Sequence, residues 1–390
     1  MSYRRTPWCW VLILICLVLV HPIQSLLSEE TKRGDGSAEE LFQAAQDASH
    51  RGDHAQAEQL YRQLLVHDPG ILPARVNLGL ACYWQHKNRE AIEELQAALR
   101  TRPREYSALL FSGLAYLDLG DYEQARKPLF EALRVKDTDP LLFWGLGSLA
   151  MVHADAEDAV YFLERSVALE PDNVQSVWLL GQAYARLAYQ EGRPPAVPAD
   201  YGSLADQTLA WLEARQADSP AAHVLKADIL VGRKLTLRAL TEYRRAQELD
   251  PKWPDIHLMI GSLLGLTGDW DAALAELQLQ LRASPHDPRT LTEMGSVLCR
   301  AGRYEEALPL LEQALTRDPD NYETQYRFGQ ANVNLNKPAS AIEPLLRAAR
   351  LEPLRSDPYY LLQRAYRAAQ QPEKAEWAFE QFNQRKANGH

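Results

Sequence analysis

Residues 288–321 read PRTLTEMGSVLCRAGRYEEALPLLEQALTRDPDN. The first half of this stretch carries apolar or small residues at helical intervals, at Leu291, Met294, Gly295 and Leu298. The second half again places apolar residues on one face of a helix, at Ala307, Leu311, Ala314 and Leu315. Gly302 lies between the halves and favours a turn, and Pro319 ends the second helix because proline cannot continue it comfortably. The stretch therefore predicts two antiparallel helices joined by a turn.

The same pattern recurs along the chain at an interval of 34 residues. Glycine marks it in the first helix, at Gly79, Gly113, Gly147, Gly181, Gly261, Gly295 and Gly329. Alanine marks it in the second helix, at Ala57, Ala91, Ala125, Ala159, Ala205, Ala239, Ala273, Ala307, Ala341 and Ala375. The step from Ala159 to Ala205 is 46 residues, which is 34 plus an insertion of 12. The chain therefore contains ten copies of one unit.

A large apolar residue stands four positions after each of these alanines, at Tyr61, Leu95, Leu129, Leu163, Leu209, Tyr243, Leu277, Leu311, Leu345 and Phe379. We expect the small residues where the two helices cross, because a missing side chain lets the backbones approach closely. A single hairpin cannot bury its apolar face alone, so neighbouring units must stack. Three units depart from the Leu-Gly pair of the first helix and carry Ala44-Ala45, Lys226-Ala227 and Leu362-Gln363 instead.

The 34-residue period, the Leu-Gly pair, the alanine of the second helix and the closing proline resemble the tetratricopeptide repeat family. The resemblance covers residues 38–389, as ten repeats. It implies an all-α fold, an α-solenoid wound as a right-handed superhelix with the first helices lining a concave groove. Members of this family usually bind peptides or partner proteins in that groove.

The N-terminal segment predicts a location outside the cytosol. Arg4 and Arg5 precede an apolar run of 13 residues, from Trp8 to Val20. This length is typical of a signal peptide and falls short of the roughly 20 residues that span a bilayer. Three interpretations are open: a leader over residues 1–25 that is removed on export, an uncleaved anchor that tethers the chain to a membrane through residues 8–20, or an apolar run that occurs by chance. Residues 26–37 predict a polar linker. We therefore expect a periplasmic, secreted, secretory-pathway or membrane-tethered protein.

The composition and the motifs of the chain limit the kinds of partner and of chemical site that it is expected to have. The chain is 46% apolar and 24% charged, and its net charge of −10 argues against nucleic acid as the main partner. Cys82 and Cys299, which lie outside the N-terminal segment, are expected to be buried thiols. The sequence holds no phosphate-binding Gly-rich loop with its lysine, no Cys-x-x-Cys pair and no Gly-x-Ser-x-Gly elbow. It therefore predicts no catalytic residue, no cofactor and no metal site.

The expected groove positions of units two to five are strongly apolar and include three tryptophans. They are Val76, Leu80, Tyr83, Trp84, Leu110, Leu114, Leu117, Leu141, Trp144, Met151, Val152 and Trp178. Exposed apolar patches of folded proteins mark binding surfaces, so these positions predict a groove for an apolar or amphipathic partner segment, with the tryptophans as anchors. The alternative is that tight winding, or the insertion, covers these side chains.

The later units predict a different surface. Their groove positions are polar and locally basic, with Arg300, Arg327 and Arg364 as the leading candidates. They favour either an acidic peptide or sugar-bearing ligand held by arginine forks, or a solvated face with internal ion pairs. The proline-rich insertion near residues 190–202 is interpreted as a spacer or as a lid on the groove. Trp377 and Phe379 in the last helix indicate either cover by the C-terminal tail or self-association through the C-terminal repeat.

Together these patterns predict a non-catalytic scaffold that binds an unidentified protein or peptide partner in an exported or membrane-tethered setting, such as envelope assembly or secretion. The alternative is a regulatory or substrate-recruiting subunit of an enzyme complex. The family's carboxylate clamp for chaperone tails is matched in none of the three-unit windows, so a cytosolic co-chaperone role is not expected.

Overall fold

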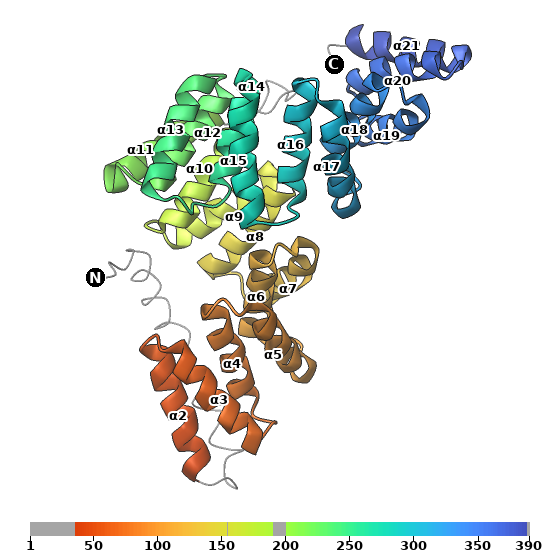
Figure 1. Ribbon diagram of the computed structural model, residues 1–390. Helices are drawn as coiled ribbons and strands as arrows, with labels where there is room; N and C mark the ends of the chain where they lie inside the picture. Colours follow the sequence, from red (N-terminus) through yellow and green to blue (C-terminus); the bar gives the residue numbers. More distant parts are fainter. Residues whose placement is uncertain (1–35, 154, 190–199, 388–390) are drawn as a thin grey trace. The chain divides into compact units, whose positions relative to one another are not determined.

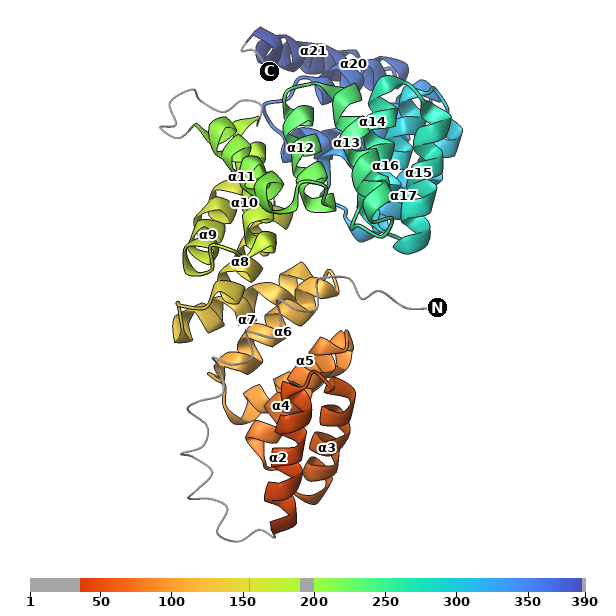
Figure 2. The ribbon, with the colours of Figure 1, turned by 90° about the vertical axis from the view of Figure 1, so that its left-hand side faces the viewer.

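The computed structural model describes residues 36–153, 155–189 and 200–387, which form twenty α-helices and no strand (Figure 1). The helices follow one another in pairs (Figures 1 and 2), and the two helices of a pair are joined by a short turn except in α10–α11, where the insertion lies between them. The chain divides into two compact units, one ending at Thr208 and the other beginning at Leu209. The predicted all-α solenoid of helix-turn-helix repeats is confirmed.

The first unit holds α2 (Gly36–His50), α3 (His54–His67), α4 (Leu72–Trp84), α5 (Asn88–Thr101), α6 (Tyr106–Asp118), α7 (Tyr122–Val135), α8 (Pro140–Val152), α9 (Ala156–Leu169) and α10 (Val174–Ala188). Helix α11 (Tyr201–Gln216) begins in this unit and ends in the next. Buried apolar side chains from α2 to α9 form one continuous core.

The second unit holds α12 (Pro220–Gly232), α13 (Thr236–Leu249), α14 (Ile256–Thr267), α15 (Trp270–Ala283), α16 (Pro288–Arg300), α17 (Tyr304–Arg317), α18 (Tyr322–Asn334), α19 (Pro338–Leu351), α20 (Asp357–Ala368) and α21 (Pro372–Ala387). Capping fixes where several of these helices begin. The Asp287 carboxylate accepts hydrogen bonds from the backbone N–H groups of Arg289 and Thr290 and from the Thr290 hydroxyl, so α16 starts directly after it.

The two helices of a repeat touch where the periodic glycine faces the periodic leucine. A Cβ atom added to the glycine would lie only 2.5 to 2.7 Å from the leucine side chain in six repeats, at Gly79, Gly113, Gly147, Gly261, Gly295 and Gly329. Real Cβ atoms do not approach carbon this closely, so each glycine is required by the branched side chain that packs on it. The spacing seen in the sequence is therefore a packing contact.

Two of the departures from Leu-Gly carry a different pair of residues at the two positions of this contact. Ala45 and Ala227 replace the glycine where the residue sixteen positions later is tyrosine, Tyr61 or Tyr243, instead of leucine. All four residues are buried. We interpret the exchange as steric, because a flat ring leaves room for a methyl group where the branched Cγ of leucine does not. The tyrosine hydroxyl groups also find partners, since Asn77 donates to Tyr61 and Tyr243 donates to Asp228.

In eight repeats the described turn between the two helices has the same backbone conformation. One residue of the turn has a positive φ, between 54° and 88°, at Gly52, His86, Gly120, Lys234, Gly268, Gly302, Asn336 and Gln370. These positions share the register of the repeat. Glycine adopts this left-handed conformation without cost, whereas a side chain at the same place is strained. The positive φ therefore follows from the position of the residue in the repeat and not from the type of residue found there.

Within each unit a first helix packs against the second helix of the preceding repeat and also contacts the first helix of that repeat. In the first unit α4 contacts α6, α6 contacts α8 and α8 contacts α10, and in the second unit α14, α16, α18 and α20 form the same chain of contacts. Among the described residues, the second helices α5, α7, α9, α15, α17, α19 and α21 make no comparable contact with one another. The first helices therefore lie closer together within each unit. We call their outward side the first-helix face of that unit.

Several predictions fall partly outside the described residues. The expected leader, residues 1–25, lies outside them, as does the expected linker except for its last two residues, which begin α2. The insertion also lies outside them up to residue 199, and α11 begins at Tyr201, so the end of the expected loop is helical. None of the helices that the structure describes is both long and apolar enough to cross a membrane.

Candidate partner-binding surfaces

Three of the predicted groove residues belong to the core of the first unit. Val76, Leu110 and Leu114 are buried, so their side chains are unavailable to a partner in this structure and their assignment to the groove is corrected. Leu114 is covered because α8 approaches α6 closely at Gly145, where an added Cβ atom would lie 2.9 Å from a Leu114 methyl group. The next repeat thus covers part of the surface that one repeat alone would expose.

Trp84 and Tyr83, at the end of α4, form an aromatic cluster with neighbouring helices. The Trp84 ring stacks on His54 of α3 at 6.1 Å between ring centroids and meets the edge of Phe111 of α6 at 5.7 Å. Tyr83 contacts the same Phe111 ring at 5.2 Å. Both residues are half-buried, so they help to hold α4 against α6 as well as presenting an edge to solvent.

The remaining apolar candidates of the first unit keep part of their surface in contact with solvent. The half-buried ones are Leu80, Leu117, Leu141, Trp144, Met151 and Trp178. Val152, the last residue of α8, is 48% exposed. In the second unit Leu266 occupies the repeat position of Trp84 and Val152 and is also exposed, which the prediction missed. The 34-residue register itself was the signal that would have found Leu266.

The predicted arginines of the second unit differ in how they are bound. The Arg327 guanidinium lies 2.6 Å from Glu323 and donates to Gln330, and Arg300 lies 3.5 Å from Glu293, which is seven residues earlier on the same helix. Arg364 has no carboxylate partner among the described residues and donates to the amide oxygen of Asn334 at 3.3 Å. Two of the three predicted arginines, Arg327 and Arg300, therefore form ion pairs with carboxylates of their own helices.

The Glu293–Arg300 pair is partly withdrawn from water. Burial raises the pKa of Glu293, and the neighbouring Glu323 adds to this effect, although Arg300 opposes it. Both side chains lie against Gly265 of α14, where an added Cβ atom would be 3.5 Å from Arg300 Nη1. Replacement of either partner would leave the other charge unpaired in a confined place, so this pair stabilises the contact between α14 and α16.

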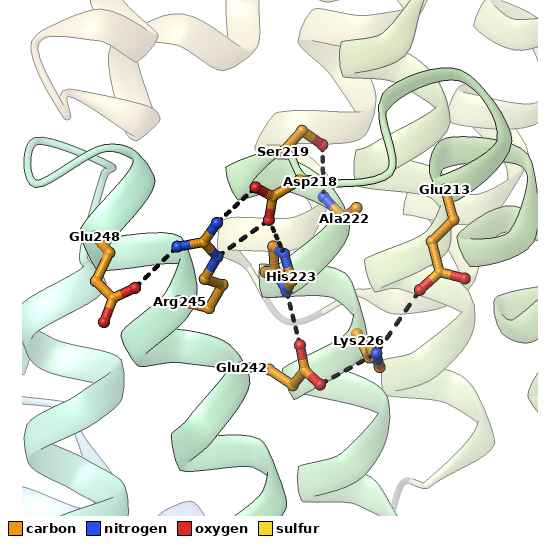
Figure 3. Close-up of polar contacts among 9 residues, drawn as sticks. All are labelled: Glu213, Asp218, Ser219, Ala222, His223, Lys226, Glu242, Arg245 and Glu248. Carbon is orange, nitrogen blue, oxygen red and sulfur yellow. Dashed lines mark hydrogen bonds and ion pairs between the residues drawn. The ribbon is translucent and has the colours of Figure 1, made fainter.

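A further polar network joins α11, α12 and α13 (Figure 3). His223 of α12 lies between two carboxylates, with Nδ1 2.7 Å from Glu242 and Nε2 3.0 Å from Asp218. Arg245 holds the other side of Asp218 at 2.6 Å, and Lys226 lies 3.1 Å from Glu242. Hydrogen bonds from Arg245 and His223 lower the pKa of Asp218.

This network repeats a structural contact found elsewhere in the chain. His223 and Glu242 are nineteen residues apart, as are His257 and Glu276 at 2.7 Å and Arg75 and Glu94 at 2.8 Å. All three pairs occupy equivalent repeat positions and join the first helix of a repeat to its second. The two histidines therefore stabilise single repeats.

One group of potential metal ligands occurs in the described part of the chain, formed by Glu58, Cys82 and Glu90. Glu58 is already bound by Lys87 at 2.7 Å and Arg62 at 2.9 Å. Burial raises the pKa of the Cys82 thiol to about 11, so the sulfur stays protonated near neutral pH. The arrangement is therefore an ion pair beside a buried thiol.

The C-terminal repeat leaves aromatic surface in contact with solvent. Trp377 and Phe379 of α21 are exposed, although Trp377 also meets the edge of Tyr359. Basic side chains at the end of α21 cover part of this region, since Arg385 lies 4.1 Å from the Tyr359 ring centroid and Lys386 lies 5.5 Å from that of Phe382. Cover by the end of α21 is thus partial, and self-association through this repeat stays a prediction.

Family models described as tetratricopeptide repeat match residues 83–140 and 298–363. Anaphase-promoting complex subunit 6 of Arabidopsis thaliana is 24% identical over 139 residues, which span 34% of this chain and only 26% of that relative. Among solved structures, MamA 41-end from Desulfovibrio magneticus RS-1 covers 43% of this chain and 96% of its own at 19% identity, with a TM-score of 0.40. The MamA RS-1 ArsTM double mutant covers 44% and 96% at 19% identity, with a TM-score of 0.39.

The matched segments lie in different units of the chain, one from the end of α4 to the start of α8 and the other from the end of α16 into α20. Outside them the helix pairs keep the same period, the Gly–Leu contact recurs at Gly147 and Gly261, and the turn conformation recurs at Gly52, Lys234 and Gly268. The repeats of this family serve as scaffolds that bind other proteins. On these grounds the chain contains tetratricopeptide repeats over residues 83–140 and 298–363, and its other described helix pairs follow the same period.

Proposed function

We propose that this protein is a non-catalytic scaffold whose first-helix face binds a segment of a partner protein in an exported or membrane-tethered setting. The supporting observation is the continuity of the first helices, because α4, α6, α8 and α10 contact one another in sequence and carry apolar side chains that remain partly in solvent. Four of these side chains, Leu117, Trp144, Met151 and Val152, lie on α6 and α8. Apolar surface of this kind favours a protein partner.

A test of this surface must leave the packing between repeats intact. Trp84 is a poor choice because its ring contacts His54 and Phe111, so its removal would disturb three helices. Val152 is better suited, since it is 48% exposed and ends a first helix. Val135 is the matched control, because it is 41% exposed and ends the second helix α7.

The experiment is affinity capture of partners from the source organism with Val152→Lys and Val135→Lys. We expect Val152→Lys to lower the recovery of the main partner about tenfold, which corresponds to about 1.4 kcal/mol, because a charge would enter an apolar contact. Val135→Lys should leave recovery unchanged. Equal recovery with both variants would contradict the proposed surface.

The exported setting is proposed from the N-terminal segment, where Arg4 and Arg5 precede the apolar run of residues 8–20. N-terminal sequencing of the protein purified from its source cell tests it. A chain that begins near residue 26 would support cleavage on export, and an intact chain in the membrane fraction would support an anchor. An intact chain in the cytosolic fraction would contradict both versions.

A further inference from the structure

Most arginines on or beside the first-helix face of the second unit are neutralised by a carboxylate. Arg289 holds Asp255 through two nitrogen atoms at 2.9 and 3.1 Å, and Arg355 lies 2.9 Å from Asp357. Arg327 and Arg300 are paired with Glu323 and Glu293, as described above. These four arginines contribute little free positive charge to the surface.

Arg364 and Arg367 of α20 are different. Both are exposed, and neither lies within 4 Å of a carboxylate in the part of the chain that the structure describes. They are three residues apart on one helix, so their side chains leave the same face. The positive charge of this stretch of α20 is therefore uncompensated, in a chain whose net charge is −10.

The surroundings of Arg364 prepare it to bind a ligand. Asn334 of α18 accepts a hydrogen bond from Arg364 Nη2, which leaves the other N–H groups of the guanidinium available. The exposed ring of Tyr360 lies one turn before Arg364, with 6.0 Å between the guanidinium carbon and the ring centroid. An aromatic ring thus stands beside Arg364, and Arg367 follows three residues later on the same helix face.

Resting on the proposed function of the first-helix face, we propose that Arg364 and Arg367 bind a short acidic segment of a partner protein in extended conformation. A guanidinium binds a carboxylate through two parallel hydrogen bonds, so each arginine takes one acidic side chain. Residues three apart on a helix have Cβ atoms about 5–6 Å apart. Alternate side chains of an extended peptide are about 7 Å apart, so two acidic residues separated by one other residue fit this pair.

The test is fluorescence anisotropy of the full chain with a labelled ten-residue peptide in which glutamate alternates with leucine and serine. We expect the peptide to bind, and its affinity to fall at least tenfold in the R364Q/R367Q variant. The matched control is R282Q/R317Q, which removes two exposed arginines from the second helices α15 and α17 of the same unit. This control should change affinity by less than twofold. A peptide with glutamine in place of glutamate should not bind.

Several outcomes would overturn the proposal. They are equal loss in both double variants, binding of the glutamine peptide with the same affinity, and absence of binding at low salt. Preferential binding of a single-stranded oligonucleotide through the same two arginines would also overturn it, because the ligand would then be a nucleic acid. The outcome is separable from that of the Val152 experiment, since the two surfaces lie in different units and one can fail while the other holds.

Discussion

Replacement of Gly295 by alanine should destabilise the eighth repeat through a collision with Leu311. The added Cβ atom would lie 2.5 Å from both Cγ and Cδ2 of Leu311, and Leu311 is fully buried, so it cannot turn away. Overpacking of a core costs about 1–3 kcal/mol, and so close a contact with a branch carbon favours the upper half of that range. Alanine also improves helix propensity by about 1 kcal/mol. The net loss should therefore be about 1–2 kcal/mol.

A double-mutant cycle isolates the collision. In a Leu311→Ala background the branched side chain is absent, so Gly295→Ala should become stabilising by about 1 kcal/mol, which gives a coupling of about 2–3 kcal/mol. Hydrogen exchange of the α16 and α17 amides measures the local stability, because repeat arrays do not always unfold in one step. Exchange in the single variant should accelerate about 5- to 30-fold. If Gly295→Ala has the same effect with and without Leu311, the steric explanation of the period is wrong.

Three further predictions concern single side chains. Lys234→Gly and Gln370→Gly should each raise stability by about 0.5–1 kcal/mol in urea unfolding, because both positions have a positive φ; a decrease would contradict the strain argument. Asp287→Ala should lower local stability by about 1 kcal/mol in the exchange of α16 amides, and Asp287→Asn should restore most of it. Glu58 is the third: burial alone would raise its pKa, but hydrogen bonds from Lys87, Gln85 and Arg62 outweigh burial and lower it. The stabilisation that the Glu58 carboxylate provides is therefore present above its ordinary pKa of 4.5 and is lost as the pH falls through the lowered value. Glu58→Gln should accordingly make the stability of the fold depend less on pH in the acid range, as measured by acid unfolding followed by circular dichroism. An unchanged acid transition would exclude this role.

The fold could be predicted from the sequence because its determining contact is periodic. The glycine of the first helix and the leucine sixteen residues later stand in the same register in six described repeats, and the structure places them in direct contact. The repeats that hold Ala45 and Ala227 depart from the expected pattern when the glycine position is considered without its partner on the second helix. Their tyrosine partners compensate, and this compensation becomes evident only when both positions of the contact are compared.

The surfaces were harder to predict because they depend on how closely neighbouring repeats approach. The sequence predicts both Leu114 and Trp144 as groove residues, yet Leu114 is covered by α8 at Gly145 and Trp144 is only half-buried. The pairing of Arg327 with Glu323 was visible as an i,i+4 spacing. The isolation of Arg367 was not visible, because it depends on which acidic side chains of other helices come within reach.

The exchange of Gly–Leu for Ala–Tyr has a consequence for how such an array can be inherited or rebuilt. Each half of the contact comes from a different helix of one repeat, so a duplication or recombination that moves a whole hairpin keeps the two halves together. A crossover inside the turn would join the first helix of one repeat, such as the one that holds Ala227, to the second helix of another, such as the one that holds Leu311. The methyl group of the alanine would then face the branched side chain of the leucine, which leaves no room for it. The complete hairpin is therefore the smallest module that can be exchanged, and a consensus sequence averaged column by column would erase the information that keeps each module self-consistent.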